Sequence, residues 1–222
     1  MELCYAKRSQ SKEIARLIMS AMSEDCCRWF AGPDHTLADF ERMMTTLVER
    51  EDSQYSYKNT LVALTEDQVL AGILVSYDGA DLLPLRRAFI EEAKTFLQRD
   101  FSDMDEETQA GELYLDSLAV LPAYRRQGIA TRLLKESVKR AQACNLPAVG
   151  LLVDCGNPNA EKLYTNVGFR FVNDAMWGGH PMRHLQYPVT NHQKNKQYEN
   201  KKLDSRASCC ARITDGDSKE HL

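Results

Sequence analysis

The stretch LYLDSLAVLPAYRRQGIATRLLKESVKRA, residues Leu113–Ala141, predicts a strand, a short loop and an amphipathic helix in succession. Gly128 and Ala130 place little side-chain bulk where the helix opens, and Arg125 and Arg126 add positive charge beside it. The first amides of a helix have no partner within the helix and carry the positive end of its dipole. The stretch therefore predicts a main-chain cradle for a pyrophosphate group.

Other phosphate-binding loops fit this stretch less well. A Walker loop needs GxxxxGK[ST], and the Lys-Ser/Thr pair is absent here. A dinucleotide-binding fingerprint needs three glycines, and only Gly128 is present. The remaining alternative is structural, in which Arg125–Ala130 forms a tight, solvated turn between strand and helix.

Strand and helix signals alternate on both sides of this stretch, through residues 1–189. Strands are expected at residues 3–6, 60–65, 69–77, 112–120, 148–153, 169–173 and 182–187, and helical periodicity runs through residues 14–22, 37–48, 85–97, 130–141 and 158–168. The pattern indicates an α/β or α+β class with three layers, in which helices cover both faces of a mixed sheet of six or seven strands.

The composition limits the remaining possibilities. From Thr190 to the end few residues are apolar and none recurs with a period, which predicts a folded domain at 1–189 and a polar, disordered tail at 190–222. The net charge of −4 argues against binding to nucleic acid, which needs a clustered basic surface. No apolar run approaches a bilayer span and no secretory signal is apparent, so we expect a cytoplasmic protein without a membrane partner. The seven cysteines lack zinc-site spacing, so no metal is expected.

Two motifs together resemble the GNAT superfamily of N-acetyltransferases. The family's [Q/R]xxGx[G/A] motif stands here as Arg125-x-x-Gly128-x-Ala130, and its NxxAxxLYxxxGF helix is matched by NPNAEKLYTNVGF, residues 157–169. The likeness covers about Glu112–Asp174. It implies a GNAT-like fold whose central sheet is splayed between the Glu112–Val120 and Ala148–Val153 strands.

The resemblance implies an N-acetyltransferase that moves the acetyl group of acetyl-CoA to a primary amine by direct attack in a ternary complex. The pyrophosphate would lie on the amides of residues 126–131, and the main chain of residues 118–120 would pair with the pantetheine arm and polarise the thioester carbonyl. The implied contacts to acetyl-CoA are Leu118, Ala119, Val120, Arg125, Arg126, Gln127, Gly128, Ile129, Ala130, Thr131, Asn157 and Tyr164.

Two side chains are the main candidates for proton transfer. Tyr164 occupies the family's usual acid position, next to the leaving thiolate, although it also belongs to an apolar helical face and could be core. Asp116 is the candidate base, with a structural hydrogen bond as the alternative, and Glu112, nearer the start of the strand, is the weaker candidate. Strand alternation would put Asp116 on the same face as Leu118 and Val120. Asn157 could equally be a helix cap, and Cys155 is expected to be a buried thiol.

The acceptor amine is not identified by the sequence. In the family it is bound by segments that correspond here to residues 26–39, 79–111 and 175–184. The acidic run at residues 100–107 could attract a cationic acceptor or be a solvated loop, and Trp29 and Trp177 could line a pocket or only pack.

Two other functions share parts of the pattern. A catalytically silent acyl-CoA-binding or regulatory domain would keep the cradle, and an interaction module would recruit partners through the tail. A GNAT-like fold would also permit a homodimer through a sheet edge or the closing hairpin.

Overall fold

The computed structural model describes residues 1–190, so the predicted tail lies, except for Thr190, outside the described residues. Its centre is a seven-stranded sheet with the order β1-β2-β3-β4-β5-β7-β6, in which β4 and β5 are parallel and all other neighbours antiparallel. The strands are β1 (Glu2–Tyr5), β2 (Thr60–Leu64), β3 (Leu70–Asp78), β4 (Glu112–Val120), β5 (Ala148–Asp154), β6 (Arg170–Trp177) and β7 (His180–Pro188). The predicted mixed sheet is confirmed.

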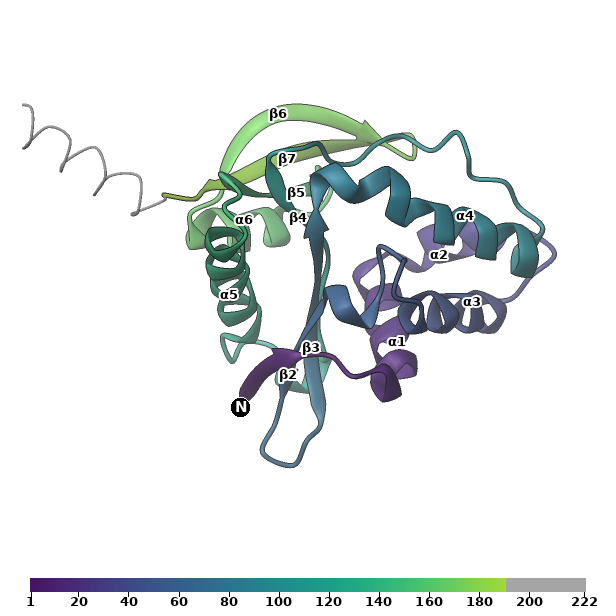
Figure 1. Ribbon diagram of the computed structural model, residues 1–222, viewed down its shortest axis with the longest axis horizontal. Coiled ribbons are helices and arrows are strands. Elements are labelled where there is room, and N and C mark those ends of the chain that lie inside the picture. Colours follow the sequence, from purple (N-terminus) through teal and green to yellow (C-terminus); the bar gives the residue numbers. More distant parts are fainter. Residues whose placement is uncertain (191–222) are drawn as a thin grey trace, which may run out of the picture. The chain divides into compact units, whose positions relative to one another are not determined.

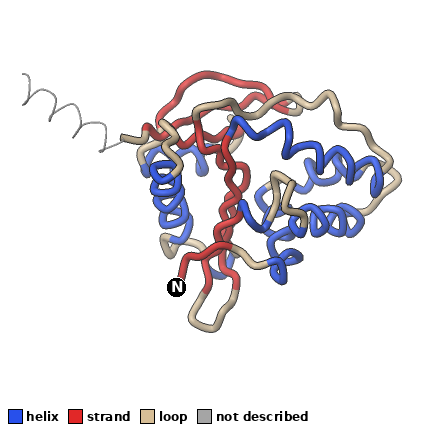
Figure 2. Tube along the Cα trace, in the orientation of Figure 1, coloured by secondary structure: helices blue, strands red, loops and turns tan. Residues whose placement is uncertain are grey.

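Helices cover both faces of this sheet (Figures 1 and 2). One face carries α1 (Ser11–Ala21), α2 (Glu24–Ala31), α3 (Leu37–Glu49) and α4 (Leu82–Leu97), and the other carries α5 (Ile129–Ala143) and α6 (Pro158–Val167). Four 3₁₀ turns, η1 (Arg8–Gln10), η2 (Tyr57–Asn59), η3 (Gly79–Asp81) and η4 (Pro122–Tyr124), complete the regular elements of residues 1–190. The three-layer α/β architecture is thus confirmed.

Helix ends follow from local side-chain chemistry. The Thr36 hydroxyl accepts a hydrogen bond from the Asp39 amide at 3.2 Å and caps α3. The Gly168 φ of 118° ends α6 in the left-handed conformation that glycine adopts without penalty. Helix α2 was not among the predicted helices. Two signals mark it: the Ser23 side chain accepts a hydrogen bond from the Cys26 amide at 3.0 Å and caps its start, and Gly32 lies at its end.

Each face of the sheet has its own hydrophobic core. The core beneath α1–α4 contains fully buried side chains such as Ile14, Phe40 and Met43, and the core beneath α5 and α6 contains Leu133 and Leu134. Full burial of one such side chain contributes about 1.5–3 kcal/mol. The two cores fix the sheet between the helical layers and thereby fix the positions of the strand ends that form the site.

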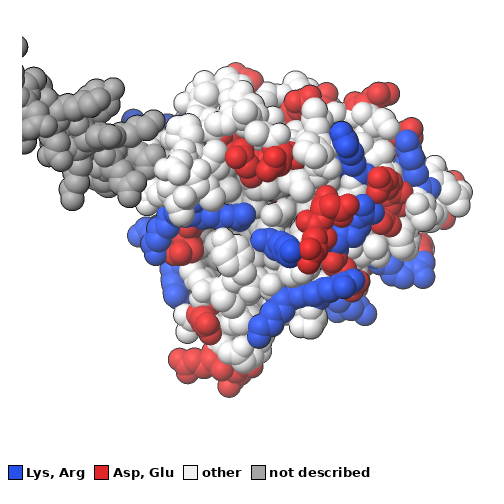
Figure 3. Space-filling view, in the orientation of Figure 1, with Lys and Arg blue, Asp and Glu red and all other residues white. Residues whose placement is uncertain are grey.

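The face of the molecule shown in Figure 3 carries acidic and basic side chains in close alternation. Among the ion pairs of the described residues, Arg50 pairs with Glu91 and Glu92 at 2.9 and 2.8 Å. This face therefore has no extended patch of a single sign. Within residues 1–190, no helix is both long and apolar enough to cross a lipid bilayer.

The parallel pairing of β4 with β5 is short. Only Glu112, Leu113 and Tyr114 of β4 have partners on β5, namely Ala148, Val149 and Gly150. Strand β4 continues to Val120 with β3 on its other side, so within residues 1–190 the segment 115–120 has no strand partner on the β5 side. The predicted splay between these two strands is therefore present, and it leaves one edge of the β4 backbone free to bind a ligand.

The opening between β4 and β5, which widens from Tyr114 towards Val120, is called the wedge below. A buried polar cluster lies at its closed end, where the two strands pair. The Glu112 carboxylate is fully buried and lies 2.8 Å from His184 Nε2, 2.7 Å from Gln186 Nε2 and 2.7 Å from the Thr108 hydroxyl. Burial raises the pKa of Glu112, but these hydrogen bonds outweigh burial and leave the pKa below its ordinary value. A Cβ atom at Gly150 would overlap this carboxylate. Glu112 is thus a structural residue, not a free base.

We expect the Gly150→Ala variant to lose about 1–3 kcal/mol of unfolding free energy, because the added methyl group must displace the Glu112 carboxylate. Chemical denaturation would measure the loss. The matched control is Gly156→Ala, whose added Cβ would meet only the exposed Asp154 side chain. Equal stability of the two variants would contradict the tight packing at the closed end of the wedge.

Candidate active site

The loop after β4 leads directly into a helix start at the open end of the wedge. Arg126 and Gly128 have positive φ values of 62° and 77°, and α5 begins at Ile129 with Gly128 as its N-cap. The helix therefore begins directly after the loop, one residue before the helical period expected from residue 130. Ile129 is buried against β3, where a Cβ atom at Gly72 would lie 3.2 Å from its side chain.

The amides at this helix start have the arrangement of an anion site. The first main-chain bond of α5 runs from the Arg132 amide to the Gly128 carbonyl at 3.0 Å, so the amides of residues 129–131 have no partner within the helix. No other described residue lies within 4 Å of the position of a Gly128 Cβ atom. An anionic group can therefore approach this backbone closely, at the positive end of the helix dipole.

Two side chains of the loop between β4 and α5 stabilise its conformation through hydrogen bonds to nearby carbonyl groups. Arg125 donates from Nε to the Val120 carbonyl at 3.1 Å, and Gln127 donates from Nε2 to the Ala123 carbonyl at 3.3 Å. Both side chains are exposed, as is that of Arg126, which forms no hydrogen bond with another described residue. Arg126 is therefore the arginine of this pair whose guanidinium is free for a ligand.

Tyr164 lies on α6 and packs against the core beneath α5 and α6. Its ring makes an edge contact with Phe169 at 5.9 Å between ring centres, and its hydroxyl forms no hydrogen bond within residues 1–190. Burial raises the pKa of Tyr164 to about 12. The hydroxyl is thus protonated at neutral pH and has no protein partner in the described part of the chain, which suits a proton donor.

Asp116 lies at an irregularity in β4. Val75 pairs with Ser117 and Ser76 pairs with Leu115, so Asp116 is an extra residue that forms a β-bulge. The bulge reverses the alternation of the strand, and Leu118 and Val120 pack with the core beneath α5 and α6. The prediction that Asp116 shares their face is therefore wrong, because simple alternation does not anticipate a bulge.

The Asp116 carboxylate belongs to a polar network on the α3–α4 side of the sheet. It accepts hydrogen bonds from Gln54 at 3.2 Å, Tyr77 at 3.3 Å and Ser117 at 2.9 Å. Burial raises the pKa of Asp116, and these hydrogen bonds only partly oppose that rise. A carboxylate with a raised pKa in a partly buried position is a suitable proton acceptor.

The same network contains a second carboxylate that sequence reasoning missed. Glu107 closes the acidic run for which a cationic acceptor and a solvated loop were both considered, but it is only 8% exposed and forms an ion pair with Arg86, which is 3% exposed. It also accepts hydrogen bonds from Tyr77 at 3.3 Å and Gln54 at 3.4 Å, the two donors that reach Asp116. Gln54 Oε1 is buried without a hydrogen-bond partner among residues 1–190.

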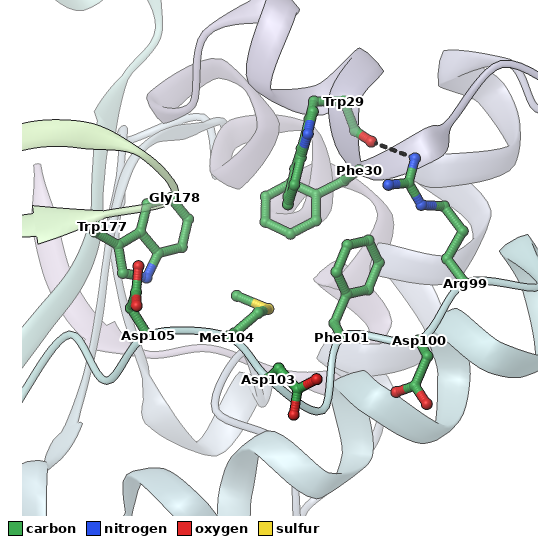
Figure 4. A pocket seen from close by; sticks show the side chains of 10 residues that line it. All are labelled: Trp29, Phe30, Arg99, Asp100, Phe101, Asp103, Met104, Asp105, Trp177 and Gly178. Atoms are coloured by element: carbon green, nitrogen blue, oxygen red, sulfur yellow. Dashed lines mark hydrogen bonds between the residues drawn. The ribbon is translucent and has the colours of Figure 1, made fainter.

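A pocket of about 280 Å³ lies next to this network (Figure 4). Trp177 lines the pocket and donates from its indole nitrogen to Glu107 at 3.3 Å, which joins the pocket wall to the network around Asp116. The other lining residues are Trp29, Phe30, Arg99, Asp100, Phe101, Asp103, Met104, Asp105 and Gly178. They come from the three segments that the family resemblance assigns to the acceptor, so Trp29 and Trp177 do line a pocket.

Other predicted residues have structural explanations. Asn157 caps α6 by accepting a hydrogen bond from the Ala160 amide at 3.1 Å, which is the alternative role considered for it. Cys155 is exposed, not buried as predicted, because β5 ends one residue earlier and the chain turns into α6. Within the described residues, no group of three or more His, Cys, Asp or Glu side chains is arranged to hold a metal ion.

Comparison with known proteins agrees with this geometry. The family model described as "Acetyltransferase (GNAT) family" matches residues 19–169. GCN5-related N-acetyltransferase 4, chloroplastic, of Arabidopsis thaliana is 33% identical over 103 residues, 46% of this chain and 30% of that protein. The ribosomal protein bS18-alanine N-acetyltransferase of Haemophilus ducreyi is 40% identical over 66 residues, 30% of this chain and 46% of that protein. The matches thus span less than half the length of each of these relatives.

A solved structure extends the likeness over most of the described chain. A crystal structure of an acetyltransferase is 27% identical, covers 86% of this chain and 100% of its own, and superposes with a TM-score of 0.72. The family model covers more than half of the chain and includes both β4 and the start of α5. The chain therefore belongs to the acetyltransferase (GNAT) family.

Proposed function

We propose that this protein is an N-acetyltransferase that moves the acetyl group of acetyl-CoA to a primary amine by direct attack. The observation that carries the proposal is the combination of the free β4 edge at residues 115–120 with the open helix start at residues 128–131. An extended thioester arm can pair with the first, and a pyrophosphate can lie on the second. Both features fit the two ends of acetyl-CoA.

We assign the contacts to acetyl-CoA from this arrangement. The main chain of residues 118–120 pairs with the pantetheine arm, and one amide of this strand polarises the thioester carbonyl. The amides of residues 126–131 and the Arg126 guanidinium bind the pyrophosphate. Arg125 acts chiefly by holding the loop against Val120, because its Nε donates to that carbonyl.

The two proton-transfer groups lie on opposite sides of β4. Tyr164 belongs to the α5–α6 side, and the Asp116 carboxylate bonds to the network on the α3–α4 side. We propose that the amine approaches from the side of the pocket at Trp177 and loses a proton to Asp116, directly or through water. Its lone pair then forms the C–N bond, the C–S bond breaks, and the leaving thiolate takes the proton of the Tyr164 hydroxyl. The extra proton on the acylated nitrogen passes through water to the Tyr164 oxygen, and Asp116 releases its proton to solvent, so both groups return to their starting states.

Two measurements on one preparation test this proposal. Calorimetry should show one acetyl-CoA bound per chain, and a thiol-release assay should show coenzyme A formed only when an amine is added. Binding without thiol release for any amine would favour the alternative of a silent acyl-CoA-binding domain. A folded protein that does not bind millimolar acetyl-CoA would contradict both functions.

The pH dependence of turnover tests the role of Asp116. Because burial raises its pKa above the ordinary value, we expect kcat/KM to rise with pH as Asp116 ionises, in a limb above pH ~4. In Asp116→Asn this limb should vanish, and kcat/KM at the optimum should fall by about 10²-fold. The control is Asp78→Asn, because the half-buried Asp78 carboxylate accepts a hydrogen bond from the Ala80 amide at 3.0 Å and none from the donors of Asp116. An unchanged acid limb in Asp116→Asn would rule out Asp116 as the base.

A further inference from the structure

The pocket beside Trp177 combines aromatic walls with carboxylates at its rim (Figure 4). Phe30 of α2, Phe101 of the segment after α4 and Trp177 of β6 supply the walls. Asp100, Asp103 and Asp105 follow one another along the segment below them. Such walls suit an apolar stem, and aromatic faces also attract cations.

The charges at the rim are not all available to a ligand. Asp100 is paired with Lys94 at 3.1 Å. The Arg99 guanidinium donates to the Trp29 carbonyl at 2.7 Å and lies 5.1 Å from the centre of the Phe101 ring, so this cation is already held. Asp103 and Asp105 are exposed and form no ion pair with a described residue. Two free carboxylates therefore remain at the mouth of an aromatic pocket.

The inner wall of the pocket leads towards the proposed base. Trp177 donates to Glu107, and Glu107 shares the donors Gln54 and Tyr77 with Asp116. The amine that reacts must lose its charge near Asp116, whereas a second ammonium group at the mouth can keep its charge beside Asp103 and Asp105. The wall at Trp177 thus adjoins the network of the proposed base, and the mouth at Asp103 and Asp105 is suited to a permanent cation.

We infer that the acceptor is a small amine that carries a second positive charge on an apolar stem, as in an alkyl diamine. The inference rests on the proposed function and adds the class of substrate. A volume of about 280 Å³ lies at the small end of ligand pockets, which favours a free small molecule. Asp103 and Asp105 then select the dication over a monoamine of the same length.

The test compares three probes of matched length, which are 1,5-diaminopentane, 1-aminopentane and 5-aminopentanoate. Thiol release gives kcat/KM for each, and tryptophan fluorescence gives binding directly, because the only two tryptophans of the chain, Trp29 and Trp177, both line the pocket. We expect the diamine to exceed the monoamine in kcat/KM by about tenfold at low ionic strength, and the aminopentanoate to be the poorest probe.

In the double variant Asp103→Asn/Asp105→Asn, the ratio of diamine to monoamine should fall to about one, because the two rim charges that create the preference are gone. The matched control is Glu66→Gln/Asp67→Asn, which removes the same charge from the exposed turn between β2 and β3 and should leave the ratio unchanged. Calorimetry with acetyl-CoA checks each variant, because unchanged affinity shows that the wedge between β4 and β5 is intact.

Equal use of diamine and monoamine by a protein that acetylates both would overturn the inference and leave the proposed function standing. A diamine preference that survives in Asp103→Asn/Asp105→Asn would overturn it as well. Failure of the wild-type protein to bind acetyl-CoA would instead refute the proposed function, and the inference with it.

Discussion

Replacing both Arg126 and Gly128 with Glu is expected to weaken acetyl-CoA binding by about a thousandfold or more. The change removes a free guanidinium and puts two carboxylates beside the amides of residues 129–131. A single repulsive pair near a protein surface amounts to about 4 kcal/mol at 4 Å, and 1.4 kcal/mol is a factor of ten in affinity. Calorimetry with acetyl-CoA measures the effect.

The control for this experiment is Gly111→Glu. Gly111 also has a positive φ, 96°, and no neighbour in the described part of the chain within 4 Å of a Cβ position, but it lies at the opposite end of β4. It therefore matches the backbone strain and the added charge at Gly128 without the proposed ligand. If the double variant binds acetyl-CoA as tightly as Gly111→Glu does, the helix start is not the pyrophosphate site.

Removing the Tyr164 hydroxyl is expected to lower kcat by about 10²–10⁴-fold, the usual contribution of a positioned proton donor. Acetyl-CoA affinity should hardly change in Tyr164→Phe, because the ring contact with Phe169 is kept. Stability should change by less than about 0.5 kcal/mol at neutral pH, since the hydroxyl has no partner among residues 1–190. Steady-state kinetics and chemical denaturation measure these quantities.

The control is Tyr187→Phe, because Tyr187 packs against Phe169 at 5.8 Å between ring centres but lies on β7. If Tyr164→Phe keeps most of its activity, as Tyr187→Phe should, Tyr164 is a core residue, which is the alternative that its apolar helical face suggests.

The pH dependence of stability gives a second test of Tyr164. Because the folded-state pKa of Tyr164 is raised to about 12, wild-type stability should be complete below pH ~10 and decline from there towards pH 12. Tyr164→Phe should lack that part of the decline.

The local features of the fold could be predicted because each depends on neighbours in the sequence. The strand–loop–helix at Leu113–Ala141 is marked by an apolar run, Gly128 and a helical period, and the end of α6 is marked by Gly168. The splay of the sheet followed only from the family resemblance, since nothing in the residues of β4 says that its pairing with β5 stops after Tyr114.

The polar network could not be predicted in the same way, because its members come from distant segments. Gln54 lies in a polar loop that resembles any solvated connection, and Glu107 closes an acidic run. One signal was available, since Arg86 falls at helical spacing between Leu82 and Phe89 on the buried face of α4, and a buried arginine requires a partner. That partner is Glu107.

The bulge at Asp116 shows a different limit. Strand alternation is a rule for regular pairing, and a single extra residue reverses it for every position that follows. The candidate base Asp116 was therefore placed on the wrong face of the strand. Its position on the α3–α4 side is what brings it to the network that adjoins the Trp177 pocket.

Amide hydrogen exchange, measured with and without saturating acetyl-CoA, tests the central claim most directly. If acetyl-CoA lies along the free edge of β4 and on the start of α5, protection should increase within residues 115–120 and 128–131, while β1 and β2 at the far edge should not change. Saturable binding that leaves both segments unprotected would contradict the assignment of this wedge as the acetyl-CoA site.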